Sequence, residues 1–381
     1  MINDIVIAGI GQTAVGEHWQ YSLRELAHFA LEAAIKDAGG LRPQALFVGN
    51  MLAPNLSRQA HLGALIADFS GLIGIEAVSV EAAGASGGAA LRQGYLAVKS
   101  GMVDVALVVG VEKFTDMVDS GVEDALATAT DSDFEAVQGL TPTSQAAMLM
   151  QRYMHEFDVP ADGFAGFPIT AHANAVDNPN AMFRRAIQES TYLRSGMVSA
   201  PLNMFDAAPP ADGAAAVILT RSELLPSDKQ HRLVRILGSA SASDMLTLHD
   251  RRDLLTFDAA RRSVDRALEK AGISLDEISF FEYHDAYSIY AALSLEAAGF
   301  AERGKGWELA RDGGITPDGR IPSAIAGGLK ARGFPGGATG VYQAVEAASR
   351  LRSTSDAGEI GIIQSLGGPA ATAVTHILAG A

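Results

Sequence analysis

A histidine that directly follows a strand-like run offers the clearest chemistry in this chain. His284 and Asp285 come after the apolar run 278–281, with Tyr283 and Tyr287 on either side. The carboxyl end of a strand is where α/β folds bind ligands. There a neutral imidazole N–H can stabilise an enolate oxygen, and either tyrosine hydroxyl can act as general acid or base once the strand has ended. Asp285 is expected mainly to hold local backbone or helix-start geometry.

Two glycine-rich turns each precede a helix of small residues. Residues 84–88 read GASGG, and residues 333–340 read GFPGGATG. The amino terminus of a helix lowers the pKa of a thiol and binds an oxyanion through its free N–H groups. Gly84 lies at such a helix start but has no reactive side-chain atom. Ser86, two residues on, has no evident base beside it that would make it a nucleophile. The second turn lacks the Lys-Ser or Lys-Thr that follows a phosphate-binding loop, so its glycines are expected to be structural.

Together, these stretches resemble the catalytic motifs of thiolases over nearly the whole chain. Residues 84–87 are similar to the Cys-x-Ser-Gly turn, with Gly84 at the nucleophile position. The second turn is similar to Gly-His-Pro-x-Gly-Ala-Thr-Gly, with Phe334 in place of histidine. The segment with His284 is similar to the His-Asp-x-Phe motif of sterol-carrier-type and archaeal thiolases. Near the carboxyl end, the Cys-x-Gly-Gly loop is represented by Ser365 to Gly368. Three of the four catalytic positions are therefore altered.

The resemblance implies a role for each matching position. His284 helps to hold the thioester oxygen, and Gly84 cannot form an acyl-enzyme. Phe334 lines an acyl pocket or simply packs. Ser365 is a hydrogen-bond partner more readily than a base, because a hydroxyl is a far weaker base than a thiolate. His172, in the segment THANA, matches a family segment near the site.

The implied substrate is a coenzyme A thioester, with no covalently bound cofactor and no metal. Gly368 belongs to the loop expected at the substrate. Lys330 and Arg332 are candidates for contacts with coenzyme A phosphates, although solvated surface charge is the favoured interpretation for both.

The elements that must position these residues form an internal repeat. A helix ending at Ala38-Gly39 is followed by the strand-like run 45–49, and a helix ending at Ala271-Gly272 by the run 278–282. Glycine directly after a helix suits a left-handed cap. Each glycine-rich turn leads to a further helix and strand, so two similar α/β halves are expected.

The resemblance implies a thiolase fold with α/β/α/β/α layers. The amino-terminal half is expected to span 1–225, with a cap or loop region at about 121–201, and the carboxyl-terminal half to span 226–381. The interpretation of the cap region as a purely structural insertion stays open.

Composition narrows the possible partners and surroundings. The 381 residues contain 48% hydrophobic residues, no cysteine and a formal net charge of −15. Such a charge argues against nucleic acid or an anionic membrane as partner. Without an apolar stretch of about 20 residues or a signal-like amino terminus, a cytoplasmic protein is expected. The absence of cysteine excludes disulfides and thiolate metal sites. The nine histidines are scattered along the chain and do not suggest a metal site either.

Three functions fit these observations. The favoured one is retro-aldol cleavage of a β-hydroxyacyl-CoA, which needs a base and an enolate site but no acyl-enzyme. The identity of the base stays open among Tyr283, Tyr287, Ser365 and Asp285, in declining preference. This resembles the thiolase-like aldolases of steroid side-chain degradation, which work with a small OB-fold, zinc-ribbon partner. The second is an acyl-CoA acyltransferase with a substituted nucleophile, and the third is a non-catalytic acyl-CoA-binding subunit. A homodimer is expected from the resemblance.

Overall fold

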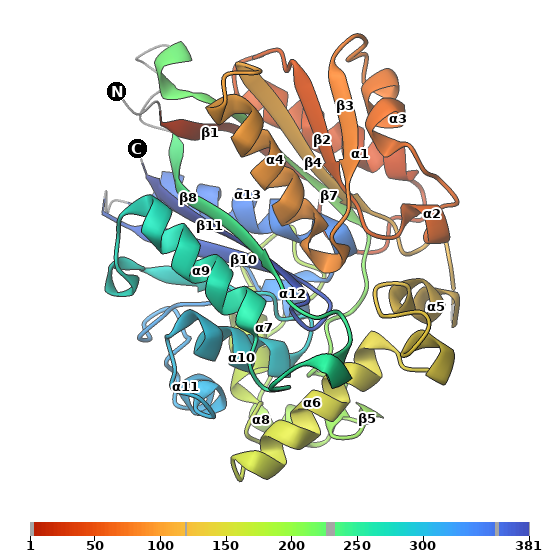
Figure 1. Ribbon diagram of the computed structural model, residues 1–381, viewed down its shortest axis with the longest axis vertical. Coiled ribbons are helices and arrows are strands. Elements are labelled where there is room, and N and C mark those ends of the chain that lie inside the picture. Colours follow the sequence, from red (N-terminus) through yellow and green to blue (C-terminus); the bar gives the residue numbers. More distant parts are fainter. Residues whose placement is uncertain (1–3, 119, 226–232, 355–357, 381) are drawn as a thin grey trace.

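The computed structural model describes residues 4–118, 120–225, 233–354 and 358–380. These residues form a mixed sheet of nine strands that runs through the molecule (Figure 1). The strands lie in the spatial order β3 (Glu76–Val80), β2 (Ala45–Gly49), β4 (Val105–Glu112), β7 (Gly213–Arg221), β1 (Ile5–Gln12), β8 (Val234–Ser243), β11 (Thr372–Gly380), β10 (Ile360–Gly367) and β9 (Phe280–Glu282).

The predicted repeat appears in the strand pairing. In the first half β2 pairs parallel with β4, β4 antiparallel with β7, and β7 antiparallel with β1. In the second half β9, β10, β11 and β8 follow the same sequence of parallel, antiparallel and antiparallel pairs. The halves meet where Val6 and Ile7 of β1 pair with Arg235 and Val234 of β8. The predicted α/β fold with two similar halves is thus confirmed, whereas the predicted boundary at 225/226 adjoins residues outside the described ranges.

Helices complete the predicted layers. The outer helices are α1 (Leu23–Asp37) against β1 and β7, and α9 (Asp258–Ala271) against β8 and β11. Between the halves lie α4 (Ser86–Lys99) and α13 (Thr339–Ser353), which contact each other. A β-carbon on Gly340 would lie 2.2 Å from the amide nitrogen of Gly88, so only glycine allows these helices to approach so closely. This confirms that the two small-residue helices are buried side by side.

Local sequence accounts for the ends of the outer helices. Ser22 and Glu25 form a reciprocal capping box at the start of α1. At the other end, α1 finishes at Asp37 and Gly39 adopts a positive φ of 73°. Helix α9 finishes at Ala271, and Gly272 caps it in the left-handed conformation. The Ala-Gly pairs therefore mark helix ends, as predicted.

The cap region consists of helices and one short strand joined by loops. It contains α5 (Ser120–Ala127), α6 (Pro142–Glu156), α7 (Gly166–Asn174), α8 (Glu189–Leu193) and β5 (Met197–Ser199), which pairs with β6 (Leu202–Asn203). Thr141 caps α6 by accepting a hydrogen bond from the Ser144 amide at 3.2 Å. In Figure 1, α6 lies near the lower end of the view and α5 at its right-hand side, both away from the chain termini. The other α-helices described are α2 (Ala53–Leu56), α3 (Leu62–Phe69), α10 (Ser288–Ala298), α11 (Gly306–Arg311) and α12 (Gly328–Arg332).

Candidate active site

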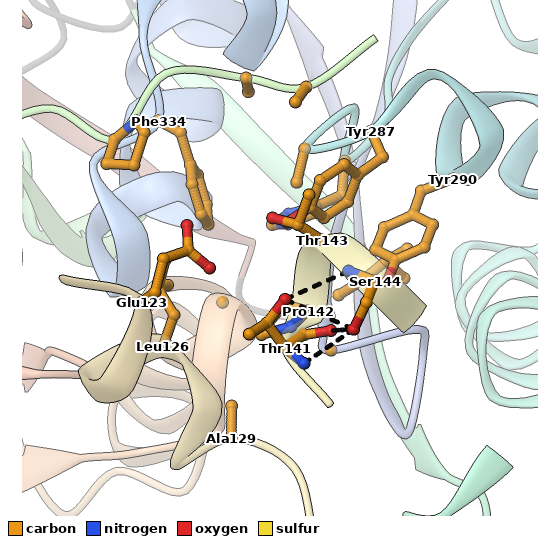
Figure 2. A pocket seen from close by; sticks show the side chains of 18 of the residues that line it. Glu123, Leu126, Ala129, Thr141, Pro142, Thr143, Ser144, Tyr287, Tyr290 and Phe334 are labelled. Carbon is orange, nitrogen blue, oxygen red and sulfur yellow. Dashed lines mark hydrogen bonds between the residues drawn. The ribbon is translucent and has the colours of Figure 1, made fainter. Parts of the chain in front are cut away.

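Both halves and the cap region line a cavity of about 470 Å³. Met51 and Gly84 come from the first half, and Glu123 from α5 lies on the same side of the cavity as Phe334 in Figure 2. Tyr287 lies on the opposite side in that view. The lining is mainly apolar; its other members are Leu126, Ala129, Thr141, Pro142, Thr143, Ser144, Val198, Ser199, Ala207, Ala208, Pro210, His284, Ala286, Tyr290, Leu366 and Gly368.

Gly84 occupies a position with no room for a side chain. It lies in the short 3-10 turn Ala83–Ala85 that leads into α4. A β-carbon on Gly84 would lie 2.7 Å from the carbonyl oxygen of Leu366 and 3.3 Å from Nε2 of His284. The first distance is shorter than van der Waals contact, so any larger residue would have to displace the backbone of β10.

His284 presents a neutral imidazole beside this glycine. The residue follows β9 and is almost completely buried. Burial, with a smaller effect from the positive charge of Arg332, lowers the pKa of His284 to about 3. Nδ1 has no hydrogen-bond partner among the described residues, whereas Nε2 faces Gly84 at the cavity. The ring can therefore donate an N–H from Nε2 to a ligand oxygen.

The ring of Phe334 packs against the imidazole of His284. The two rings meet edge to face, with centroids 5.7 Å apart and an interplanar angle of 88°. Phe334 also packs against the ring of Phe114, with centroids 6.4 Å apart. Phe334 thus lines the cavity and also packs against its neighbours.

Asp285 starts a helix instead of facing the cavity. Its carboxylate accepts hydrogen bonds from the amides of Leu329 at 2.8 Å and Lys330 at 3.4 Å. These bonds hold the first turn of α12, which is the helix-start role expected for Asp285. Because Asp285 does not line the cavity, its place among the base candidates is corrected.

Two of the proposed hydroxyl groups also lie away from the cavity. Tyr283 is buried in the core, edge to face with Phe281 and Phe167. Ser365 points at α4, because a β-carbon on Gly88 would lie only 2.2 Å from Oγ of Ser365. Alternation along β10 instead brings Leu366 to the cavity. Tyr283 and Ser365 are therefore removed from the set of candidate catalytic residues.

Tyr287 does line the cavity, but its hydroxyl is already engaged. It lies 3.0 Å from Oγ1 of Thr143. Burial raises the pKa of Tyr287 above its ordinary value, although the hydrogen bond with Thr143 lowers it. The phenol is therefore protonated at neutral pH and is a poor proton acceptor.

The cations proposed for coenzyme A are buried and engaged. Lys330 donates to the carbonyl oxygens of Met204 at 2.8 Å and Ala207 at 2.5 Å. Burial lowers the pKa of Lys330 to about 8. Arg332 is 1% exposed and pairs with Glu346 at 2.5 Å. Lys330 and Arg332 are therefore not the solvated surface charges that the sequence favoured. Their existing partners also leave neither side chain free for the expected contacts with coenzyme A phosphates.

His172 is also held away from the cavity. Its Nδ1 lies 3.1 Å from the carbonyl oxygen of Arg185, and its ring stacks on Phe183 with centroids 6.0 Å apart. Burial lowers the pKa of His172. The residue does not line the cavity, so a direct ligand contact is not supported.

Glu112 joins segments that border the site. Its buried carboxylate accepts hydrogen bonds from the amides of Met51 at 3.0 Å, Leu52 at 3.1 Å and Gly337 at 2.9 Å. The segment after β2 and the turn before α13 are thus tied to the end of β4. Burial raises the pKa of Glu112 to about 7, opposed by these hydrogen bonds.

Sequence patterns did not identify Glu123 or Tyr290 as site residues. Both side chains line the cavity, and the hydroxyl of Tyr290 has no hydrogen-bond partner among the described residues. Glu123 lies in the cap region, where no sequence motif indicates a site residue. Tyr290 lies three residues after Tyr287, so it follows on the same face of α10. Only helical periodicity from the histidine motif could have indicated Tyr290.

Comparisons with known proteins identify the family of this chain. The thiolase N-terminal domain model matches residues 5–223, and the thiolase C-terminal domain-like model matches residues 240–380. Acetyl-CoA acetyltransferase of Methanothermobacter thermautotrophicus is 40% identical over 99% of both chains. Sterol carrier protein 2 of Bos taurus is 27% identical over 74% of this chain and 54% of its own length. The chain therefore belongs to the thiolase family, as the sequence motifs predicted.

A solved structure supports the fold. The structure described as Ltp2-ChsH2(DUF35) aldolase has a TM-score of 0.82 and 24% sequence identity, over 99% of this chain and 98% of its own. At this identity the likeness concerns the fold. Within the described ranges, no helix is long and apolar enough to cross a membrane. Nor do three or more His, Cys, Asp or Glu residues in those ranges gather as a possible metal site.

Proposed function

We propose that this chain breaks or makes a carbon-carbon bond in an acyl-CoA through a thioester enolate, without an acyl-enzyme. Retro-aldol cleavage of a 3-hydroxyacyl-CoA is the favoured reaction. Membership of the thiolase family supports the substrate class. The observation that carries the proposal is the closed position at Gly84, with the imidazole of His284 beside it.

The cavity supplies donors suited to an enolate oxygen. Nε2 of His284 is the first. The amides of Gly84 and Gly368, which line the cavity, have no hydrogen-bond acceptor within the described part of the chain and are further candidates. Donors placed around a developing negative charge in a site with little water usually contribute most to such a reaction. Because His284 stays neutral, it can donate this bond without first gaining a proton.

Mass spectrometry of products tests the proposal. The protein is incubated with matched 3-hydroxyacyl, 3-ketoacyl and saturated acyl thioesters of coenzyme A. We expect the 3-hydroxyacyl thioester to give a carbonyl compound and a shortened acyl-CoA. Binding of thioesters with no product, alone or with a partner, would support the non-catalytic subunit instead.

Acyl transfer is the second candidate, because a relative 40% identical is an acetyl-CoA acetyltransferase. If this chain were such an enzyme with only its nucleophile replaced, Gly84→Cys should create a covalent acyl-enzyme. We expect none, and a loss of about 1–3 kcal/mol in the free energy of unfolding from overpacking. The reason is the 2.7 Å approach of a β-carbon to the Leu366 carbonyl oxygen.

Intact-protein mass spectrometry after incubation with acetyl-CoA, together with urea denaturation, measures both effects. Ala89→Cys is the matched control, because Ala89 is a half-buried position in α4, the helix that follows the turn with Gly84. Acylation of Gly84→Cys but not of the control would favour the acyltransferase and count against the lyase.

A small partner protein is part of the proposal. The solved structure with TM-score 0.82 is described as an aldolase complex that includes a DUF35 component. The cations first considered for coenzyme A are buried here, so a partner could supply contacts to the phosphates. Measuring cleavage with and without an OB-fold, zinc-ribbon protein tests this point; equal rates would remove the partner from the proposal.

We further propose that two copies of the chain associate. β3 is one of the two outer strands of the sheet, and Val78 on it is 49% exposed. An uncovered apolar edge strand is suited to pairing with a second copy across a two-fold axis. Light scattering at micromolar concentration should give twice the monomer mass, and Val78→Lys should shift the protein toward the monomer. A monomer in the unmodified protein would contradict the proposal.

A further inference from the structure

The cavity contains one carboxylate that the motifs do not account for. Glu123 projects from α5 into the lining, on the side opposite Tyr287 in Figure 2. It is partly buried, and no ion pair or hydrogen bond to its side chain occurs within the described ranges. Burial raises the pKa of Glu123. A carboxylate kept in a mainly apolar cavity without a partner costs stability, which calls for a functional reason.

The groups across the cavity from Glu123 carry no positive charge that would balance its carboxylate. Across the cavity His284 is neutral, while burial raises the pKa of Tyr287 and of Tyr290, so both phenols are neutral as well. The negative charge of Glu123 adds a small contribution to the raised pKa of Tyr287, after the larger effect of burial. Helix α2, which packs against α5, carries no titratable side chain, and neither do residues 141–144, which line the same cavity.

The segment between β4 and α5 carries an ammonium that is already paired. Nζ of Lys113 lies 3.4 Å from both Asp116 and Asp212. Asp212 also accepts hydrogen bonds from the amides of Phe114 at 2.7 Å and Thr115 at 3.0 Å. The ammonium of Lys113 is therefore paired with these two carboxylates, and it does not neutralise the carboxylate of Glu123 in the cavity.

We propose that Glu123 is the catalytic base that takes the proton from the β-hydroxyl of a 3-hydroxyacyl thioester in this cavity. The inference rests on the lyase function proposed above and supplies the proton acceptor that the reaction requires. It also follows from elimination, because Tyr283, Ser365 and Asp285 lie outside the cavity. The hydroxyl of Tyr287, which does line it, is hydrogen-bonded to Thr143.

The step balances within the cavity. The Glu123 carboxylate accepts the hydroxyl proton, and the oxygen's electron pair forms the new carbonyl double bond. The bond between Cα and Cβ breaks, and its electron pair passes into the thioester enolate, whose oxygen accepts the N–H of His284 Nε2. Glu123 then returns the proton to Cα. A carbonyl compound and a shortened acyl-CoA leave, with no oxidant, reductant or water consumed.

Glu123→Gln tests this role, because it keeps the size and polarity of the side chain and removes the base. We expect kcat for 3-hydroxyacyl-CoA cleavage to fall at least about 100-fold. Binding of the matched saturated acyl-CoA should change by less than about threefold. Asp124→Asn is the matched control, since it removes an adjacent, exposed carboxylate that does not line the cavity.

The pH profile separates a base from a merely structural residue. Glu123 acts only when ionised, so kcat/KM of the unmodified protein should fall as the pH decreases through the raised pKa of Glu123. The residual activity of Glu123→Gln should lack this acid limb. Glu123→Asp should retain the limb at a reduced rate, because the carboxylate is displaced by one methylene.

Failure of the inference and failure of the lyase proposal give different results. If the unmodified protein cleaves 3-hydroxyacyl-CoA and Glu123→Gln does so within threefold with the same acid limb, Glu123 is not the base and the lyase proposal stands. If the unmodified protein binds the thioesters and cleaves none, both are overturned. Equal losses in Glu123→Gln and Asp124→Asn would indicate a general effect of charge and would also overturn the inference.

Discussion

Replacement of His284 by alanine is expected to lower kcat for cleavage by about 100- to 1,000-fold, the usual effect of losing one oxyanion donor. The imidazole is the side chain that faces Gly84, and its Nε2 donates to the thioester oxygen in the proposed reaction. The fold should remain intact, because no hydrogen bond from the ring to the described residues is lost. Because the pKa of His284 is about 3, the loss should be similar across the neutral pH range.

Turnover by mass spectrometry and folding by circular dichroism measure the two parts of this prediction. His249→Ala is the control, because His249 is 58% exposed and does not line the cavity. His284→Asn, which keeps an N–H donor on a shorter side chain, should recover part of the lost rate. Turnover by His284→Ala close to that of the unmodified protein would remove His284 from the mechanism.

Replacement of Arg332 by alanine is expected to lower the free energy of unfolding by about 3–5 kcal/mol, the usual cost of removing one partner from a buried ion pair. The guanidinium is 1% exposed, lies 2.5 Å from Glu346 and stacks 5.1 Å above the ring of Tyr342. Without it, the carboxylate of Glu346 stays buried with no compensating charge. Denaturant unfolding measures the change.

The loss of unfolding free energy in Arg332→Ala should be smaller at low pH than at high pH. Burial raises the pKa of Glu346, and Arg332 lowers it, so the variant should raise that pKa further. A carboxyl group with a folded-state pKa above its unfolded value stabilises the folded state at low pH, and this stability is lost as the pH rises through the folded-state pKa. The defect of Arg332→Ala should therefore be smaller at pH 5 than at pH 8. A defect that grows on acidification would contradict this account.

Two variants control for the size of the effect. Arg311 also pairs with a carboxylate, Asp312 at 3.3 Å, and lies 4.4 Å above the ring of Trp307, but it is 46% exposed. Arg311→Ala should cost no more than about 1 kcal/mol. Replacing both buried partners, as in Arg332→Met with Glu346→Leu, should be less destabilising than Arg332→Ala alone. A defect in Arg332→Ala as small as that in Arg311→Ala would refute the buried-pair argument.

Much of the fold was predictable because its determinants are local. The Ala-Gly pairs ended helices where a left-handed cap was expected, and the glycine-rich turns preceded the helices buried between the halves. His284 and Phe334 were placed at the cavity by motifs that set their position relative to a strand or turn. Local signals of this kind depend on a few neighbouring residues and survive without knowledge of long-range packing.

The orientation of individual side chains was less predictable. Asp285 and His284 are adjacent, yet one starts α12 and the other faces the cavity. Ser365 and Leu366 are likewise adjacent in β10, and alternation sends only Leu366 to the cavity. A motif identifies such a segment, but which side chain reaches the site depends on the element packed against it.

The sequence alone determined the family, the repeated α/β halves and the absence of a cysteine nucleophile, because each is a property of residue identity and order. The tertiary structure decided which polar groups meet. It buried Lys330 against carbonyl oxygens of a segment far away in the sequence and Arg332 against Glu346 of α13, and it brought Glu123 from the cap region into the same cavity as His284. Burial and charge pairing depend on contacts between distant segments, so residue type and spacing do not specify them.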